Sequence, residues 1–192
     1  MMFEHSYTDF DAFAADAQRW DLRLKQLDSG QFQAGLLQFV AEGVQVSEAR
    51  FGRTIRQQGN HPHGLRTVVI PAVANFDFEW RGAKIDGDSM MIFPEGGELD
   101  ALSRSKFHIF TCSFPESLLA NVASSLGIAN LGEGNSEVVQ CRTDRMAKLR
   151  RLLREMCTRV GDDYSPLGTA EFAESVSLDL PQLLLQAAAN GR

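Results

Sequence analysis

The stretch of sequence that decides the fold is residues 22–51, LRLKQLDSGQFQAGLLQFVAEGVQVSEARF. Leucines alternate with Arg and Lys over 22–25, which is the period-two pattern of a strand with one buried face. Glycine-containing turn signals at 28–30 and 42–43 divide the rest into two further strands. Three short strands joined by tight turns favour an antiparallel sheet.

The same pattern continues to about residue 113, and glycines stand in almost every gap between the apolar runs. A short helix precedes the strands; Thr8 and Asp11 have the approximate spacing of a capping box, and the helix ends before Trp20. Many short strands with Gly turns imply a sandwich or a barrel. Strands are predicted over 22–25, 32–40, 44–51, 65–71, 75–80, 89–93 and 106–114.

After Ser113 the apolar period becomes helical. Ser113 and Glu116 have the spacing of a capping box, and Gly127 is a natural stop for the first of these helices. A second helix is predicted over 144–160, with Thr143 as its cap.

A third helical stretch begins near 165–166, and Pro181 must kink or interrupt it. The fold class predicted from these patterns is α+β. We expect a short N-terminal helix and a β-barrel over 1–114, followed by two or three helices over 115–192.

The helix predicted over 144–160 carries an apolar seam with alternating spacings of three and four residues. This seam is expected either to pack onto the barrel or to pair with the same helix of a second copy, which makes it the candidate dimerisation surface. Its basic residues Lys148, Arg150, Arg151 and Arg154 are interpreted as the solvated side of the helix rather than as a phosphate site. The residues of the seam are Met146, Leu149, Leu153, Met156 and Val160.

Bulk properties narrow the function. The 192 residues carry a formal net charge of −6, whereas a free-standing nucleic-acid binder is expected to be basic. No apolar run is long enough to cross a bilayer, and the N-terminus lacks the pattern of a signal peptide. Three widely spaced cysteines fit a reducing compartment, so a cytoplasmic protein is expected.

The strongest indication of an enzyme is the pair His61 and His63, whose spacing suits two imidazole ligands of one metal. Metal-binding cupins also need a carboxylate shortly afterwards, but none stands in 64–67, and Leu99 occupies a position where a further His is needed. The string is therefore interpreted as a turn, and no metal or cofactor is expected.

Two other groups contain residue types that are common in catalytic sites. The acidic cluster Glu95, Glu98 and Asp100 suits a cation or a ligand amine, but a solvated loop is the preferred interpretation. Cys112 and His108 share one face of a strand, yet they lie about 13 Å apart along it, too far for a nucleophile–base pair. We therefore expect no catalytic site.

The order of elements resembles the N-terminal sensor domain of AraC/XylS-type transcription regulators. The resemblance covers nearly the whole chain, including the capped helix at Pro115 and the Leu/Arg-rich helix over 146–156. The strings that carry it are WD at 20–21, QLDSGQF at 26–32, WRG at 80–82, FPEGGELDA at 93–101 and FHIFTCSF at 107–114.

This resemblance implies a cupin-like barrel that holds a small-molecule effector, helices that form a homodimer, and DNA binding only through a C-terminal helix-turn-helix domain that this chain does not contain. Phe39, Arg66, Trp80 and His108 lie on predicted strands and are the candidate effector-binding residues. The alternative is a stand-alone cupin-type protein, either a metal-dependent enzyme using His61 and His63 or a simple binding module.

Overall fold

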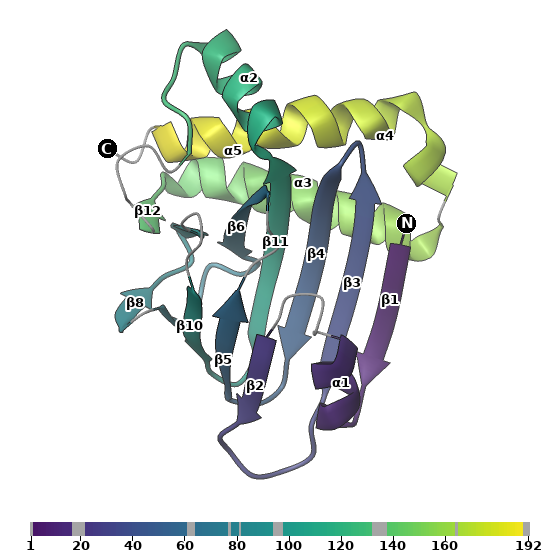
Figure 1. Cartoon of the computed structure of the whole chain (residues 1–192), viewed down its shortest axis with the longest axis vertical. Helices are drawn as coiled ribbons and strands as arrows, with labels where there is room; N and C mark the ends of the chain where they lie inside the picture. Colours follow the sequence, from purple (N-terminus) through teal and green to yellow (C-terminus); the bar gives the residue numbers. More distant parts are fainter. Residues whose placement is uncertain are drawn as a thin grey trace.

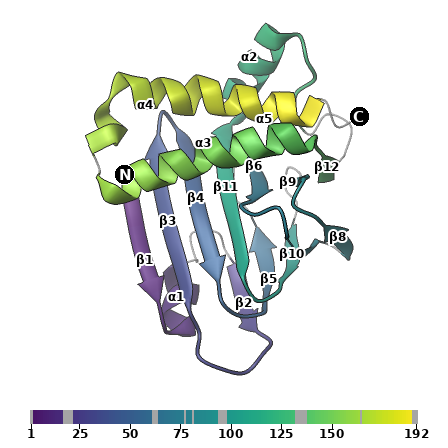
Figure 2. The ribbon, with the colours of Figure 1, turned by 180° about the vertical axis from the view of Figure 1, so that it is seen from behind.

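The structure, a computed structural model, describes residues 2–16, 22–60, 64–76, 78–80, 82–93, 98–131, 138–163 and 165–189. A small sheet, a large sheet and a group of helices lie one behind another (Figures 1 and 2). One hydrophobic core lies between the two sheets, and a second lies between the large sheet and the helices. The predicted α+β fold, with a β part followed by helices, is confirmed.

The large sheet is antiparallel throughout its described pairs and is built around the hairpin predicted over residues 32–51. Its order is β1 (Met2–Tyr7), β3 (Ala34–Ala41), β4 (Val44–Phe51), β11 (Phe107–Pro115), β6 (Leu65–Pro71), β9 (Ser89–Ile92) and β12 (Val138–Gln140).

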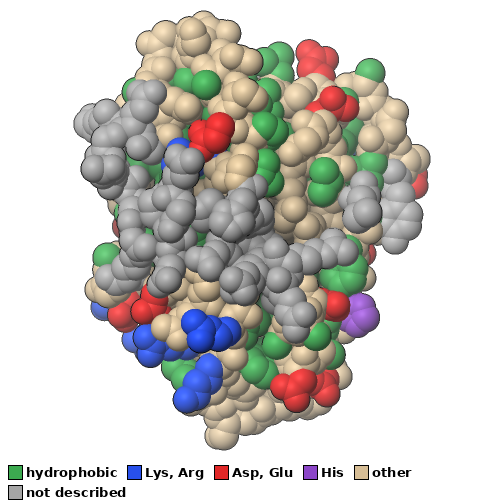
Figure 3. Space-filling view, in the orientation of Figure 1, with side chains coloured by type: hydrophobic (Ala, Val, Ile, Leu, Met, Phe, Trp, Pro, Cys, Tyr) green, Lys and Arg blue, Asp and Glu red, His purple; other side chains and the backbone are tan. Residues whose placement is uncertain are grey.

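The small sheet packs against one face of the large sheet. Its outer face carries mixed Lys/Arg and Asp/Glu side chains over the lower part of the view in Figure 3, as expected for a solvated surface. Its order is β2 (Leu22–Gln26), β5 (Ile55–Asn60), β10 (Glu98–Ser103), β7 (Phe78–Trp80) and β8 (Ala83–Ile85).

The helices cover the other face of the large sheet, where α3 and α5 run side by side across its strands (Figure 2). Helix α1 stands apart, at the opposite end of the strands (Figure 1). The helical elements are α1 (Phe10–Asp16), α2 (Glu116–Leu126), α3 (Thr143–Asp162), the 3₁₀ turn η2 (Ser165–Gly168), α4 (Ala170–Glu174), the π-helical turn η3 (Ser175–Asp179) and α5 (Leu180–Ala189).

The predicted interruption at Pro181 takes the form of η3, which ends two residues before it. A π-helical turn shifts the register of the backbone hydrogen bonds, which lets the helix continue past a proline that has no N–H to donate. The helices and the large sheet share one hydrophobic core. The division of the chain into units 1–114 and 115–192 stays a prediction.

Several local predictions were wrong. Strands β1, β5, β8, β10 and β12 were not predicted. The three helix caps expected at Thr8, Ser113 and Thr143 are also absent from these positions in the described structure. Asp9, not Thr8, accepts the first N–H groups of α1. Ser113 lies within β11 and bonds Thr67, and the Thr143 hydroxyl donates to Asp88 instead of capping α3.

Candidate functional site

The candidate site is a cavity of about 90 Å³ between the two sheets. Aromatic rings supply much of its wall, among them Phe51, Phe93 and Phe107. At one end Phe13 of α1 packs against Phe51, with ring centroids 5.2 Å apart, so α1 covers this end of the space. A small, mostly apolar enclosure with a few polar groups is the usual form of a small-molecule site.

A row of three polar side chains crosses the inner face of the large sheet. Ser47 on β4 stands opposite Gln38 on β3 and Thr111 on β11, and all three line the cavity. The next inward row contains Leu36, Ala49 and Ile109, which are apolar, so this row is not continued by polar side chains on the large sheet in that direction.

A second row lies on the small sheet. Gln57 on β5 and Trp80 on β7 flank Ala101 on β10, which is opposite both of them in the register. All three line the cavity. Gln57 and Trp80 therefore lie on either side of the short side chain of Ala101, along the same wall of the cavity.

Two of these polar groups have no hydrogen-bond partner among the residues that the structure describes. The hydroxyl oxygen of Ser47 and the indole nitrogen of Trp80 are both buried and unpaired, and their residues are only 5% and 2% exposed. A buried polar group without a partner costs about 1–3 kcal/mol, so native proteins keep few of them. A bound molecule with suitable polar atoms would pair both.

The described lining contains one ionisable side chain, Asp16 at the α1 end. Its carboxylate accepts a hydrogen bond of 2.7 Å from the Tyr7 hydroxyl. Burial, and then this hydrogen bond, raise the pKa of Tyr7 above its ordinary value. Lys, Arg and His are absent from the part of the lining that the structure describes, so the cavity offers no positive partner for an anion there.

Of the four residues predicted to bind the effector, only Trp80 lines this cavity. Phe39 points to the opposite face of the large sheet, where it is fully buried and its ring centroid lies 5.5 Å from that of Phe172. Arg66 pairs with Glu116 at 2.8 Å, at the edge of the helical layer.

His108 also faces away from the cavity. Its Nε2 lies 2.6 Å from Oε1 of Glu48, and Arg50 donates to the same carboxylate oxygen. Burial raises the pKa of Glu48, but hydrogen bonds from His108 and Arg50 outweigh this effect and lower the pKa below its ordinary value. The group is thus a charge cluster on the outer face of the sheet, separate from the cavity.

The polar residues Gln38, Ser47, Gln57 and Thr111 were missed. Alternation along a strand gives two faces, but it does not say which of them faces the cavity. In this fold the helices bury the apolar face, so the row containing Gln38 faces the cavity and its neighbour Phe39 does not. The usable signal was the helix predicted to follow the strands, because its apolar seam needs an apolar sheet face as partner.

The five seam residues of α3 are all buried within this chain, between 0% and 3% exposed. They form one core with the outward side chains of the large sheet and with α5. The first of the two partners expected for the seam, the barrel, is therefore the observed one. A dimerisation role for Met146, Leu149, Leu153, Met156 and Val160 is not supported by this arrangement, because their side chains have no free surface.

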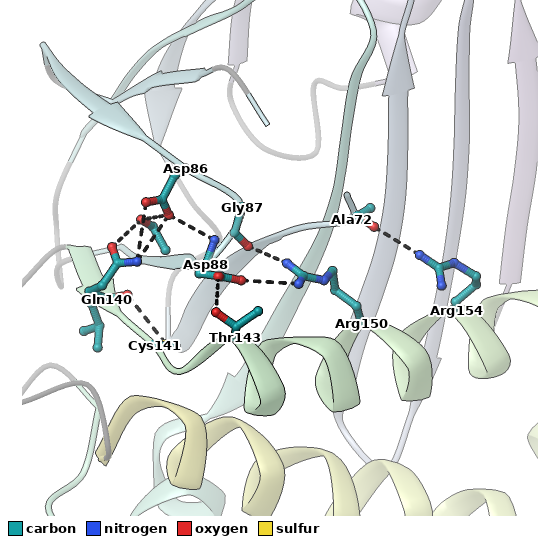
Figure 4. A network of polar contacts seen from close by, with 11 residues as sticks. Ala72, Asp86, Gly87, Asp88, Gln140, Cys141, Thr143, Arg150 and Arg154 are labelled. Atoms are coloured by element: carbon teal, nitrogen blue, oxygen red, sulfur yellow. Dashed lines mark hydrogen bonds and ion pairs between the residues drawn. The ribbon is translucent and has the colours of Figure 1, made fainter. Parts of the chain in front are cut away.

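The basic side of α3 is only partly solvated. Arg151 is exposed, but Arg150 is 7% exposed and donates to the backbone carbonyl of Gly87 and, at 3.3 Å, to Asp88 (Figure 4). The other oxygen of Asp88 accepts a 2.7 Å hydrogen bond from Thr143 at the start of the helix. The interpretation of Arg150 as a solvated residue was wrong.

One turn further along α3, Arg154 donates to the carbonyl of Ala72 at 3.1 Å (Figure 4). Ala72 directly follows β6, whose Val69 lines the cavity. These bonds attach α3 to the ends of two strands of the large sheet.

The residues of the metal site that the sequence suggests lie largely outside the described part of the chain. His61, His63 and Glu95 lie outside it, and among the described residues there is no group of three His, Cys, Asp or Glu that could hold a metal ion. Asp100 pairs with Arg56 on the exposed side of the small sheet. Cys112 is fully buried, and burial raises the pKa of its thiol, so it does not suit a nucleophile.

Comparison with solved structures gives a match over the whole architecture. The AraC-like transcriptional activator CuxR matches 98% of this chain and 70% of its own, with 13% sequence identity and a TM-score of 0.70. The chain has the fold of this AraC-like activator. An RmlC-like cupin from Shewanella frigidimarina matches 48% of this chain and 83% of its own, with 14% identity and a TM-score of only 0.32.

No family profile matches the sequence, and no curated protein matches it. Within the described residues, no helix is long and apolar enough to cross a membrane.

Proposed function

We propose that this chain is the effector-sensing and dimerisation domain of an AraC-type transcription regulator, not an enzyme, and that it acts in the cytoplasm. The observation that carries the proposal is a cavity between the two sheets with two unpaired polar groups, within a fold shared over 98% of the chain with an AraC-like activator. In this proposal DNA is bound only through a helix-turn-helix domain attached to this one.

The mechanism is linkage between the cavity and the helices. An effector shifts the protein toward whichever arrangement binds it better. Alternate residues of the same strands face the two cores: Ser47 and Thr111 line the cavity, while Val46 and Cys112 pack in the core that includes α3. A small movement of β4 or β11 on binding therefore changes the surface on which α3 rests.

The contacts of Arg150 and Arg154 give α3 a second attachment to the sheet. The helices then change the spacing or orientation of the DNA-binding units of two copies, which decides the half-sites that they span. Since the seam of α3 is occupied within the chain, the proposed dimer uses another surface of the helical layer.

Native mass spectrometry of the purified chain, with elemental analysis of the same sample, tests the proposal. We expect a dimer that holds no stoichiometric metal. A monomer with one equivalent of iron, manganese or zinc would overturn it in favour of a cupin-type enzyme that uses His61 and His63. A metal-free monomer would leave a simple binding module and remove the dimerisation part of the proposal.

A further inference from the structure

We infer that the molecule held in the cavity is compact and uncharged, and that it carries a hydrogen-bond acceptor for the indole of Trp80 and a second polar group for the hydroxyl of Ser47. This inference rests on the proposed function, in that it names the class of effector. It follows from the two unpaired groups, from the charges on the described lining and from the size of the space.

The unpaired groups fix the polar chemistry of the ligand. An indole N–H donates and does not accept, so the ligand atom facing Trp80 is an acceptor, such as a hydroxyl, ether or carbonyl oxygen. The Ser47 hydroxyl donates or accepts, and Gln38 and Thr111 beside it can do both. A hydroxyl or amide group on the ligand satisfies this row in either direction.

The two rows stand on opposite sheets, which sets the arrangement of these groups. Sheets that pack face to face are about 10 Å apart, and side chains from both project into that space. Trp80 reaches in from the small sheet and Ser47 from the large sheet. The ligand therefore has polar atoms on two sides and a carbon framework between them, in contact with the Phe rings and Ala101.

Charge and size narrow the class further. Without a basic side chain in the described lining, an anion would lose its hydration and gain no ion pair. The carboxylate of Asp16 is already bonded to Tyr7, at the end of the cavity covered by α1. The volume of about 90 Å³ is of the same order as an engineered cavity of ~150 Å³ that binds one benzene molecule, so the space suits a compact molecule of about five non-hydrogen atoms.

The test uses four small probes: neutral propane-1,2-diol, anionic lactate, cationic 1-aminopropan-2-ol, and benzene, which has no polar atom. Each is titrated into the ¹⁵N-labelled chain while the indole N–H signals are followed. The sequence contains two Trp, and the spectrum of Trp80→Phe assigns the signal of Trp80. We expect a saturable shift of this signal with the diol, at a lower concentration than with any other probe.

Two Ser→Ala variants on inward positions provide the matched comparison. Ser47→Ala removes an unpaired hydroxyl of the cavity, and the loss of one hydrogen bond should weaken diol binding about five-fold. Ser113→Ala removes a hydroxyl that is bonded to Thr67 and does not line the cavity, so diol binding should be unchanged in it.

Tighter binding of lactate or aminopropanol than of the diol would overturn the inference, and so would binding of benzene alone. The same holds if none of the probes moves the Trp80 signal, or if Ser47→Ala binds the diol as well as the unaltered chain does. None of these results bears on oligomeric state or metal content, so the proposed function can stand when this inference fails.

Discussion

The unpaired hydroxyl of Ser47 leads to an unusual stability prediction, best seen against Ser113. Both serines lie on inward positions of the large sheet, and both are buried. Ser113 shares a 2.8 Å hydrogen bond with Thr67, and both of these residues are fully buried. Ser47 has no partner. The same Ser→Ala change is therefore expected to destabilise the protein at Ser113 and not at Ser47.

Ser113→Ala leaves the Thr67 hydroxyl buried and unpaired, which should lower the free energy of unfolding by about 1–3 kcal/mol. For a domain of this size each kcal/mol lowers Tm by about 2–4 °C. Ser47→Ala breaks no bond and removes a buried group that lacks one. Its free energy of unfolding should stay within about 0.5 kcal/mol of the unaltered value, or rise.

Urea unfolding followed by circular dichroism measures both changes in the ligand-free chain. Equal m-values in the three proteins would confirm that the variants unfold over the same exposed surface. A loss at Ser47→Ala as large as that at Ser113→Ala would refute the reasoning, because it would mean that the Ser47 hydroxyl makes a stabilising bond within the protein.

Three further predictions concern single contacts of the fold. Arg150→Ala should lower the free energy of unfolding by about 2–4 kcal/mol, because it leaves the carboxylate of Asp88 without its cation. Arg151→Ala, at an exposed position of the same helix, should lower it by less than about 0.5 kcal/mol. Equal losses of stability in thermal melts of the two variants would contradict the attachment of α3 through Arg150. A Cβ at Gly87 would clash with the backbone carbonyl of Ala74, so Gly87→Ala should fold poorly or lose more than about 2 kcal/mol of its free energy of unfolding. Gly35→Ala, whose Cβ would meet open space, is the control and should differ by less than about 1 kcal/mol. A Gly87→Ala chain as stable as the unaltered one would show that the close approach of Gly87 and Ala74 is wrong. Folding lowers the pKa of Glu48, so the ionised carboxylate stabilises the protein above the ordinary pKa of a glutamate, and this contribution is lost as the pH falls from about pH 5 downwards. In urea unfolding at several pH values, the free energy of unfolding of Glu48→Gln should therefore fall less steeply with acid than that of the unaltered chain. The same pH dependence in both proteins would count against the ion cluster at Glu48.

The fold could be predicted from the sequence because its main patterns are local. Period-two alternation over 22–51 and helical spacing after Ser113 each report the period of one element, and the structure has the corresponding strands and helices. Strand β5 escaped because its residues are largely polar: its hydrogen bonds with β2 and β10, rather than an apolar pattern, hold it in the small sheet.

The site could not be predicted with the same success, because it depends on which face of each strand the helices cover. Gln38 and Phe39 are neighbours in the sequence, and only the packing of α3 and α4 decides that the phenyl ring faces the helices and the amide faces the cavity. A one-residue error of this kind reverses every assignment on a strand. Trp80 lines the cavity and Arg66 and His108 do not, but no pattern in the sequence distinguished the three.

The apolar seam of α3 shows a related limit of sequence patterns. The spacing of its apolar residues indicates one apolar face but does not say what covers it. The large sheet and α5 supply that cover, so the seam gives no information about a second copy. Likewise the basic side of α3 gave no sign that Arg150 would be drawn down to the loop at Gly87 and Asp88.

The most direct measurement of the central claim is a reporter assay with the chain fused to a helix-turn-helix unit that does not dimerise by itself. Its occupancy of one half-site is compared with that of two correctly spaced half-sites, and the unfused unit is the control. A sensing and dimerisation domain predicts that the fusion binds the paired sites at least about ten-fold more tightly than the single site. Equal occupancy of single and paired sites, as for the unfused unit, would contradict the account.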